Sequence, residues 1–277
     1  MRLALAAAYT HLLCRSDFFV VNKIAIWLLG LLCLSSAGAQ TPLRVAAAAD
    51  LEPVLAPLFE QFRQATGIRA EATFSASAVL ATQIQNGAPF DLFLSADTGY
   101  PKRLIDAGLA AAAGSADSST PIIYARGTLV LWARKDSPLP APSLELLRSA
   151  QLKRLAIANP DRAPYGRAAV AALTSLKLYD TLKPRLVTAE NIAQAAQFVD
   201  TGNADAGLIS LTSALTPRLT ADGAYFVLPR DLYPAIEQGA VIVSKTAQRA
   251  AVHKLLDYLL SAAVQAQLAK SGLTPVH

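Results

Sequence analysis

From Leu43 onward, short apolar runs alternate with amphipathic stretches, a pattern typical of α/β proteins. The run Leu43 to Ala48 predicts a buried strand. The apolar residues that follow are spaced as on one face of a helix, and Gly67 is a natural residue to end it. These apolar positions are Val54, Leu55, Leu58, Phe59 and Phe62. The chain therefore opens with a strand followed directly by a helix.

The same pattern continues to the C-terminus and predicts a series of strands and helices. Further strands are expected at residues 69–74, 92–95, 155–158, 185–189, 207–210 and 225–228. Helices are expected at residues 79–86, 101–107, 166–176, 191–201, 252–260 and 264–270. The segment from Ala110 to Thr120 is rich in Ala, Ser and Gly, which predicts a surface connection. This alternation of strands and helices favours a parallel α/β architecture.

Two segments are long enough to pass from one part of the molecule to another. The stretch Ile122 to Arg134 favours β structure and has Gly127 in its middle, and Gln238 to Val243 forms a later return with Gly239 inside it. Two crossings predict two discontinuous lobes around one cleft, with hinges near the two glycines. We expect lobe I at residues 43–126 plus 236–277 and lobe II at residues 127–235.

The first forty residues differ from the rest of the chain. Lys23 precedes the apolar run Ile24 to Leu34, and the small residues that follow resemble a signal-peptidase site. The run is shorter than the roughly 20 residues of a membrane-spanning helix, so we expect removal of a signal peptide at residues 1–39. Both cysteines, Cys14 and Cys33, lie in this segment, so the exported chain needs no disulfide.

The composition disfavours several classes of function. Only His253 and His277 remain after the leader, which gives a transition-metal site or a Ser-His-Asp triad little to build on. The chain contains no G-x-S-x-G, S-x-x-K, G-x-G-x-x-G or G-x-x-x-x-G-K-[ST] motif. The formal net charge of +5 is too mild to indicate nucleic-acid or membrane binding. We therefore expect a protein that is neither an enzyme nor a nucleic-acid binder, and that needs no cofactor.

A recurring arrangement along the chain is a strand followed at once by a helix start. Five such places are Asp50-Leu51, Ser77-Ala78, Tyr165-Gly166, Asn191-Ile192 and Ser210-Leu211. Helix starts offer free backbone N–H groups and a partial positive charge, which together bind anions. Ligands of open α/β sheets collect at the carboxyl ends of the strands. Each of these residues taken singly also fits an ordinary helix cap.

Several segments resemble the periplasmic molybdate-binding proteins. They are Val45-Ala-Ala-Ala-Ala-Asp50-Leu51, Phe74-Ser-Ala-Ser77, Gly87-Ala-Pro-Phe-Asp91-Leu-Phe-Leu-Ser-Ala-Asp97, Ala158-Asn-Pro-Asp-Arg-Ala-Pro-Tyr165-Gly166, Ala189-Glu-Asn-Ile192 and Gly207-Leu-Ile-Ser210. The resemblance runs from about Leu43 to the C-terminus. It implies a two-lobed type II periplasmic binding protein fold, a periplasmic location, molybdate or tungstate as ligand, and an ABC transporter permease of the inner membrane as partner. We expect a monomer.

The resemblance also implies which residues bind the oxyanion. The family's first serine falls on Asp50 and its second on Ser77, while backbone donors fall on Tyr165 and Ile192. The family's tyrosine near the last turn is replaced by Ser210, and the phenol of Tyr165 is a candidate substitute for it. Molybdenum would be held only as the oxyanion, without direct bonds from protein to metal.

Asp50 is the most informative departure from the family pattern. A carboxylate about 4 Å from an anion costs on the order of 4 kcal/mol at an effective dielectric near 20. One interpretation is that Asp50 caps its own helix through the N–H of Glu52, because Pro53 has none. The other is that Asp50 accepts a proton from the ligand, which keeps phosphate, or another oxyanion such as sulfate, open as an alternative. A periplasmic α/β hydrolase is the rival from another class.

Overall fold

The computed structural model describes residues 41–112 and 119–276. The predicted signal peptide at residues 1–39 and part of the predicted connection after Ala112 lie outside the described residues. Within the described ranges, no helix is both long and apolar enough to cross a membrane.

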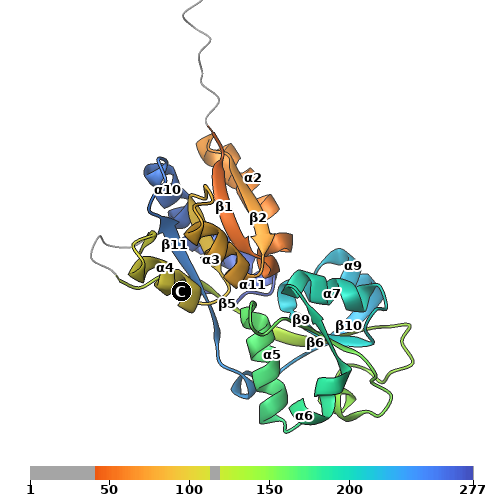
Figure 1. Ribbon diagram of the computed structural model, residues 1–277. Helices are drawn as coiled ribbons and strands as arrows, with labels where there is room; N and C mark the ends of the chain where they lie inside the picture. The colour runs from red at the N-terminus through yellow and green to blue at the C-terminus, as the bar shows by residue number, and fades with distance from the viewer. Residues whose placement is uncertain (1–40, 113–118, 277) are drawn as a thin grey trace, which may run out of the picture. The chain divides into compact units, whose positions relative to one another are not determined.

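Two β-sheets organise the chain from Pro42 onward (Figure 1). The first sheet has the spatial order β2 (Ala70–Ser75), β1 (Leu43–Ala48), β3 (Leu92–Ser95), β11 (Ile236–Val243) and β4 (Ala110–Ala112), and β5 (Ile122–Gly127) also pairs with β11. The second sheet has the order β10 (Gly223–Val227), β6 (Leu129–Arg134), β9 (Ala206–Ser210), β7 (Leu155–Ala158) and β8 (Leu186–Ala189).

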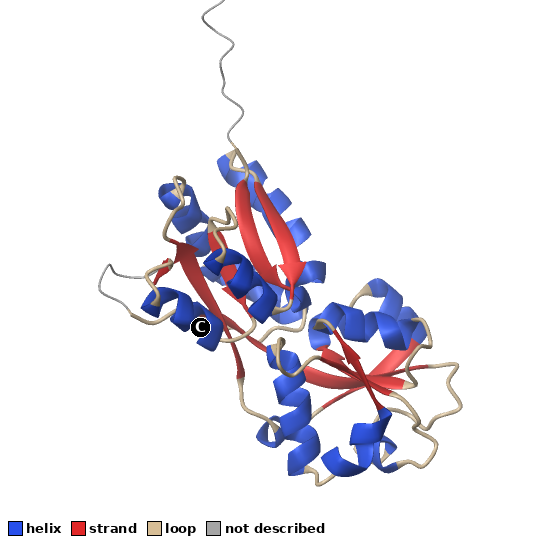
Figure 2. Cartoon of the chain, in the orientation of Figure 1, coloured by secondary structure: helices blue, strands red, loops and turns tan. Residues whose placement is uncertain are grey.

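Helices cover both sides of each sheet (Figure 2). The helices associated with the first sheet are α2 (Glu52–Thr66), α3 (Ser77–Gln85), α4 (Gly99–Asp106), α10 (Arg249–Leu260) and α11 (Ala262–Lys270). Those associated with the second are α5 (Pro164–Ser175), α6 (Tyr179–Leu182), α7 (Ile192–Asp200), α8 (Leu211–Ala214) and α9 (Pro217–Asp222). Single 3-10 turns complete the chain: η1 (Ala49–Leu51), η2 (Leu146–Arg148), η3 (Lys183–Arg185) and η4 (Arg230–Leu232).

Alternation along the central strands of the first sheet explains its three layers. In β1, Val45 and Ala47 pack into the apolar cluster that holds α2, α10 and α11, whereas Ala46 between them packs into the cluster with α3 and α4. Successive side chains of a strand point to opposite faces, so a strand covered on both faces is apolar at almost every position. β1 and β3 show this pattern, since every residue except Arg44 and Ser95 is apolar.

Most of the predicted elements are confirmed, and three expectations need correction. The sheets are mixed, because β11 runs antiparallel to β3, and β6 antiparallel to β9. In each sheet one strand, β11 in the first and β6 in the second, runs antiparallel to all of its neighbours. The predicted surface connection begins with a strand, β4, which pairs with β11. The short helices α6, α8 and α9 were not expected, because four to six residues carry too little periodicity to be detected.

Candidate functional site

A small cavity lies where the carboxyl ends of β1 and β2 meet the starts of helices α3, α5 and α7. About 190 Å³ of it is free of protein atoms, counting the part open to solvent. Its polar lining includes Asp50, Ser75, Ser77, Tyr165 and Asn191. The remaining lining residues are Ala48, Ala49, Ala76, Ala96, Ala163, Pro164 and Ile192. Four of the five predicted ligand residues therefore share one cavity, and among its lining residues there is no Lys, Arg or His.

Ser77 is the first residue of α3 and is almost completely buried. Its Oγ accepts a hydrogen bond from the N–H of Ala96 at 3.1 Å, which fixes the hydroxyl between the ends of β2 and β3. Because this bond uses only the oxygen, the O–H remains able to donate to an anion. The nearby N–H of Ala78 donates to the carbonyl of Arg162, so elements of the two sheets meet directly here.

Tyr165 enters the cavity from the first turn of α5, after Pro164. Its phenol donates to Asp50 Oδ2 at 3.2 Å. Gly127 makes this placement possible, since a Cβ at that position would lie 2.3 Å from the phenol oxygen. Gly166 likewise lets α5 approach β7, because its Cβ would lie 2.3 Å from the carbonyl oxygen of Ala158. Two glycines thus fix the position of this tyrosine.

Ile192 is the first residue of α7, and the side chain of Asn191 caps that helix. Asn191 Oδ1 accepts from the N–H of Gln194 at 2.9 Å. The N–H of Ile192 belongs to the first turn, where helix geometry supplies no intrahelical acceptor. It can therefore donate to an anion in the cavity.

Asp50 is completely buried at the end of β1, and its side chain turns toward the second sheet and β11. Oδ2 accepts from the Tyr165 phenol and from the Gln238 amide, whereas Oδ1 is buried without a partner among the described residues. The interpretation of Asp50 as a helix cap is wrong. Helix α2 has Leu51 at its N-cap and no side-chain cap, and Pro53 in its first turn removes a donor.

The environment of Asp50 changes its acidity. Burial raises the pKa of the Asp50 carboxyl from 3.8 to about 6, although the hydrogen bonds from Gln238 and Tyr165 lower it. Burial also raises the pKa of the Tyr165 and Tyr124 phenols well above 10, and the nearby Asp50 adds to both shifts. Both phenols are therefore neutral at any physiological pH, and Asp50 is the group in this network that can change its charge.

Ser210 does not line the cavity and is not part of the proposed ligand set. It is the N-cap of the four-residue helix α8, and its Oγ accepts from the N–H of Ser213 at 3.3 Å. The same oxygen lies 2.9 Å from the Thr212 and Ser213 hydroxyl oxygens. Thr212 in turn donates to the backbone carbonyl of Asp50 at 2.7 Å. Ser210 thus contacts Thr212, and Thr212 holds the backbone carbonyl of Asp50.

The side chain of Arg167 contacts Asp97 and Tyr100. It forms an ion pair with Asp97 and donates to the Tyr100 hydroxyl at 3.2 Å. Tyr100 also donates to the carbonyl of Asp161 at 3.3 Å. Asp97 accepts from the N–H of Tyr100 as well, as expected for a residue near a helix start. These contacts join α5 and the segment before it to the region after β3.

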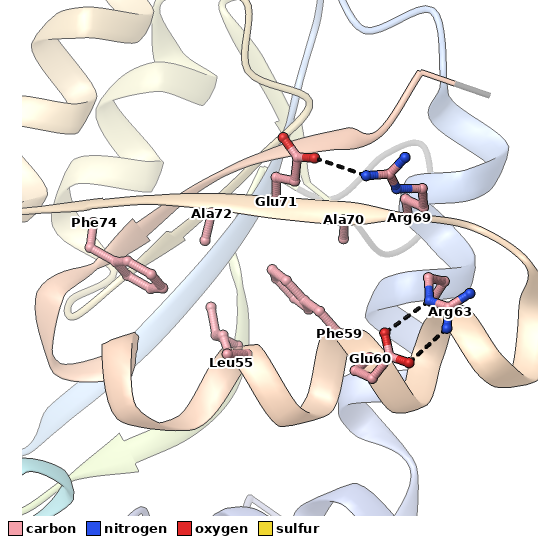
Figure 3. Close-up of a pocket in the computed structure, with 10 residues that line it drawn as sticks. Leu55, Phe59, Glu60, Arg63, Arg69, Ala70, Glu71, Ala72 and Phe74 are labelled. Atoms are coloured by element: carbon pink, nitrogen blue, oxygen red, sulfur yellow. Dashed lines mark hydrogen bonds and ion pairs between the residues drawn. The ribbon is translucent and has the colours of Figure 1, made fainter. Parts of the chain in front are cut away.

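A larger hollow on the surface has a different character (Figure 3). It lies between α2 and the edge strand β2, and the side chains of Leu55, Phe59 and Phe74 point into the space between them. Its charged groups are already paired, Arg63 with Glu60 and Arg69 with Glu71. An open, largely apolar hollow whose arginines are paired with carboxylates is poorly suited to an oxyanion, so the smaller polar cavity is the candidate site.

Gln238 is the site residue that the sequence analysis missed. It is a completely buried amide in strand β11, and its Oε1 has no partner among the described residues. The available signal was a polar residue directly before the apolar run Gly239 to Val243. The described part of the chain has no cluster of three or more His, Cys, Asp or Glu side chains placed to hold a metal ion.

The comparisons with known proteins agree with this geometry. The family of bacterial extracellular solute-binding proteins matches residues 43–274. The molybdate-binding protein ModA of Azotobacter vinelandii is 38% identical over 241 residues, which cover 87% of this chain and 92% of that protein. ModA of Rhodobacter capsulatus is 36% identical over 72% of this chain and 74% of its own length.

A solved structure extends the similarity to the fold. The periplasmic molybdate-binding protein of Azotobacter vinelandii superposes with a TM-score of 0.78 and 31% sequence identity, covering 85% of this chain and all 100% of that chain. The predicted two-lobed α/β fold is thereby confirmed. The chain belongs to the bacterial extracellular solute-binding proteins.

Proposed function

We propose that this chain is the periplasmic component of an ABC importer and that it captures molybdate or tungstate. The observation that carries the proposal is the cavity itself, in which helix starts and hydroxyl groups converge without any basic side chain. Such sites bind dispersed negative charge through neutral donors. The similarity to molybdate-binding relatives supports molybdate as the first choice among tetrahedral oxyanions.

The proposed donors come from both sheets. From the first sheet come the Ser77 hydroxyl and the backbone around Asp50, and from the second come the N–H groups of Tyr165 and Ile192. These groups would replace the hydration shell of the anion when the two lobes close on it. No bond to the ligand is made or broken in this mechanism, so capture requires neither a nucleophile nor a cofactor.

We further propose that lobe I comprises residues 43–126 and 236–277 and lobe II residues 127–235. The support is that β5 and β11 lie in the first sheet, whereas β6 to β10 lie in the second. The segments around Gly127 and Gly239 then connect the lobes. The exported, monomeric protein would deliver its ligand to a permease in the inner membrane.

Isothermal titration of the purified protein with molybdate, tungstate, sulfate and phosphate tests the proposal. We expect molybdate and tungstate to bind with similar affinity, and sulfate and phosphate at least about tenfold more weakly, about 1.4 kcal/mol. Phosphate binding tighter than molybdate would overturn the choice of ligand.

Phosphate is the second candidate ligand because of Asp50. It carries a proton near neutral pH and could donate to an ionised Asp50, which fully ionised molybdate cannot do. The same titration series separates these candidates. Turnover of a phosphate ester by the purified protein would instead favour the hydrolase, the rival function from the enzyme class.

A further inference from the structure

We propose that the site binds its fully ionised oxyanion together with one proton, which resides on Oδ1 of Asp50 and is donated in a hydrogen bond to the ligand. This inference rests on the proposed function and assigns Asp50 as a residue that determines specificity and pH dependence. It makes anion capture a proton-coupled event in this chain.

The hydrogen bonds of Asp50 distinguish its two oxygens. Oδ2 accepts from the Tyr165 phenol and the Gln238 amide, and so is occupied as an acceptor. Oδ1 is buried and has no partner among the described residues, although Asp50 lines the cavity. A protonated carboxyl group needs one oxygen that accepts and one that donates. The arrangement around Asp50 therefore places the proton on Oδ1.

The charges around Asp50 also require a proton when an anion binds. The titratable groups that face Asp50 are the phenols of Tyr165 on α5 and Tyr124 on β5, with Tyr233 next to Tyr165. The other side chains that contact it or line the cavity, from α3, α7, α8 and β11, are uncharged. No cation among them offsets a carboxylate beside a dianion. Like charges in a buried site raise the pKa of the carboxyl group, so binding draws in a proton.

The acidity of Asp50 fixes the pH range in which this coupling is measurable. The ligand-free carboxyl has a pKa of about 6, raised by burial, so it is mostly ionised at pH 7.5 and must take up a proton on binding. For one linked proton, Kd rises about tenfold per pH unit above this pKa, until the pKa of the bound state is reached. Below about pH 5 the carboxyl is mostly protonated before binding, and affinity changes little with pH.

The test is calorimetric titration of the exported protein, which lacks the predicted signal peptide at residues 1–39, with sodium molybdate at pH 5, 6.5, 7.5 and 8.5. At pH 7.5 the titration is repeated in buffers of different ionisation enthalpy, which counts protons taken up per anion. The wild-type protein should take up about 0.9 proton and lose about tenfold in affinity between pH 6.5 and 7.5. Asp50→Asn keeps the shape and replaces Oδ1–H by an amide donor, so it should take up none and show no such pH dependence.

A control variant and three contrary outcomes complete the test. Asp161→Asn removes an exposed carboxylate outside the cavity lining and should behave as the wild type. Molybdate binding without proton uptake in the wild-type protein would overturn the inference and leave the proposed function intact. An equal pH dependence in Asp50→Asn would also overturn it. Failure of wild-type protein to bind molybdate at any pH, with phosphate bound instead, would overturn the proposed function and make Asp50 a proton acceptor.

Discussion

Two aspartates lie where the elements of the first sheet meet those of the second, and their surroundings differ in kind. Asp50 is completely buried among a phenol, an amide and a hydroxyl group, with no cation in contact. The side chain of Asp97 is 20% exposed and forms an ion pair with Arg167, which is 43% exposed. Both residues follow strands of the first sheet, β1 and β3.

The difference shows how one fold uses the same side chain for two purposes. A buried carboxylate without a cation is costly to ionise, so it responds to pH and to nearby anions. An exposed ion pair contributes little free energy and is screened by salt, but it can select one arrangement of the elements it joins. Asp50 thus sets the charge of the cavity, whereas Asp97 helps to join the elements of the two sheets next to it.

The largest effect is expected from removing the charge of Asp50. Its folded-state pKa of about 6 lies above the ordinary 3.8, so its stabilising contribution is complete below pH 3.8 and is lost as the pH rises through 6. Asp50→Asn should therefore raise the free energy of unfolding of the ligand-free protein by up to about 3 kcal/mol at pH 7.5. The gain should vanish near pH 4. Urea unfolding at both pH values measures it.

Asp97→Asn is the matched control for this experiment. It removes a carboxylate that has a cationic partner and should give no stabilisation at either pH. Identical pH profiles for Asp50→Asn and the wild-type protein would show that burial does not perturb Asp50, and the contrast between the two aspartates would fail.

Most of the fold could be predicted from the sequence, but only part of the site could. Strands such as Leu43–Ala48 and Leu92–Ser95 were predictable residue for residue, because burial on both faces makes them apolar at almost every position. Helix starts also placed Ser77, Tyr165 and Ile192 correctly at the cavity. The partners of Asp50 could not be predicted, since Gln238 lies 188 residues away in a strand of the first sheet.

Ser210 illustrates the limit of local patterns. It follows a strand and begins a helix, just as Ser77 does, yet its hydroxyl is used within α8 and by Thr212. The two serines differ in what packs against them, and that depends on tertiary contacts between distant segments.

A smaller effect is expected from Gly127, which determines whether Tyr165 reaches Asp50. A methyl group in Gly127→Ala would lie 2.3 Å from the phenol oxygen and 2.8 Å from the ring carbon that bears it. Displacing the phenol or the backbone should cost about 1–3 kcal/mol of stability. Molybdate affinity should fall about tenfold or more. Thermal unfolding measures the loss of stability, and calorimetric titration measures the loss of affinity.

Gly99→Ala provides the control for Gly127→Ala. Its Cβ would meet nothing closer than 3.7 Å, so stability and affinity should stay near wild-type values. A Gly127→Ala protein that binds molybdate as tightly as the wild type would show that the Tyr165 phenol is not needed near Asp50.

The smallest effect is expected from the ion pair at Asp97. Arg167→Gln removes the charge while keeping a polar side chain, so the loss of stability should stay near the 0.2–1 kcal/mol typical of exposed pairs. Because the pair joins elements of the two sheets, molybdate affinity should fall by no more than about fivefold at low salt. The difference from wild type should disappear near 1 M NaCl, where the screening length is about 3 Å. Titration at both salt concentrations measures this. A loss that persists at high salt would place Arg167 in the electrostatics of the cavity and remove the distinction between the two aspartates.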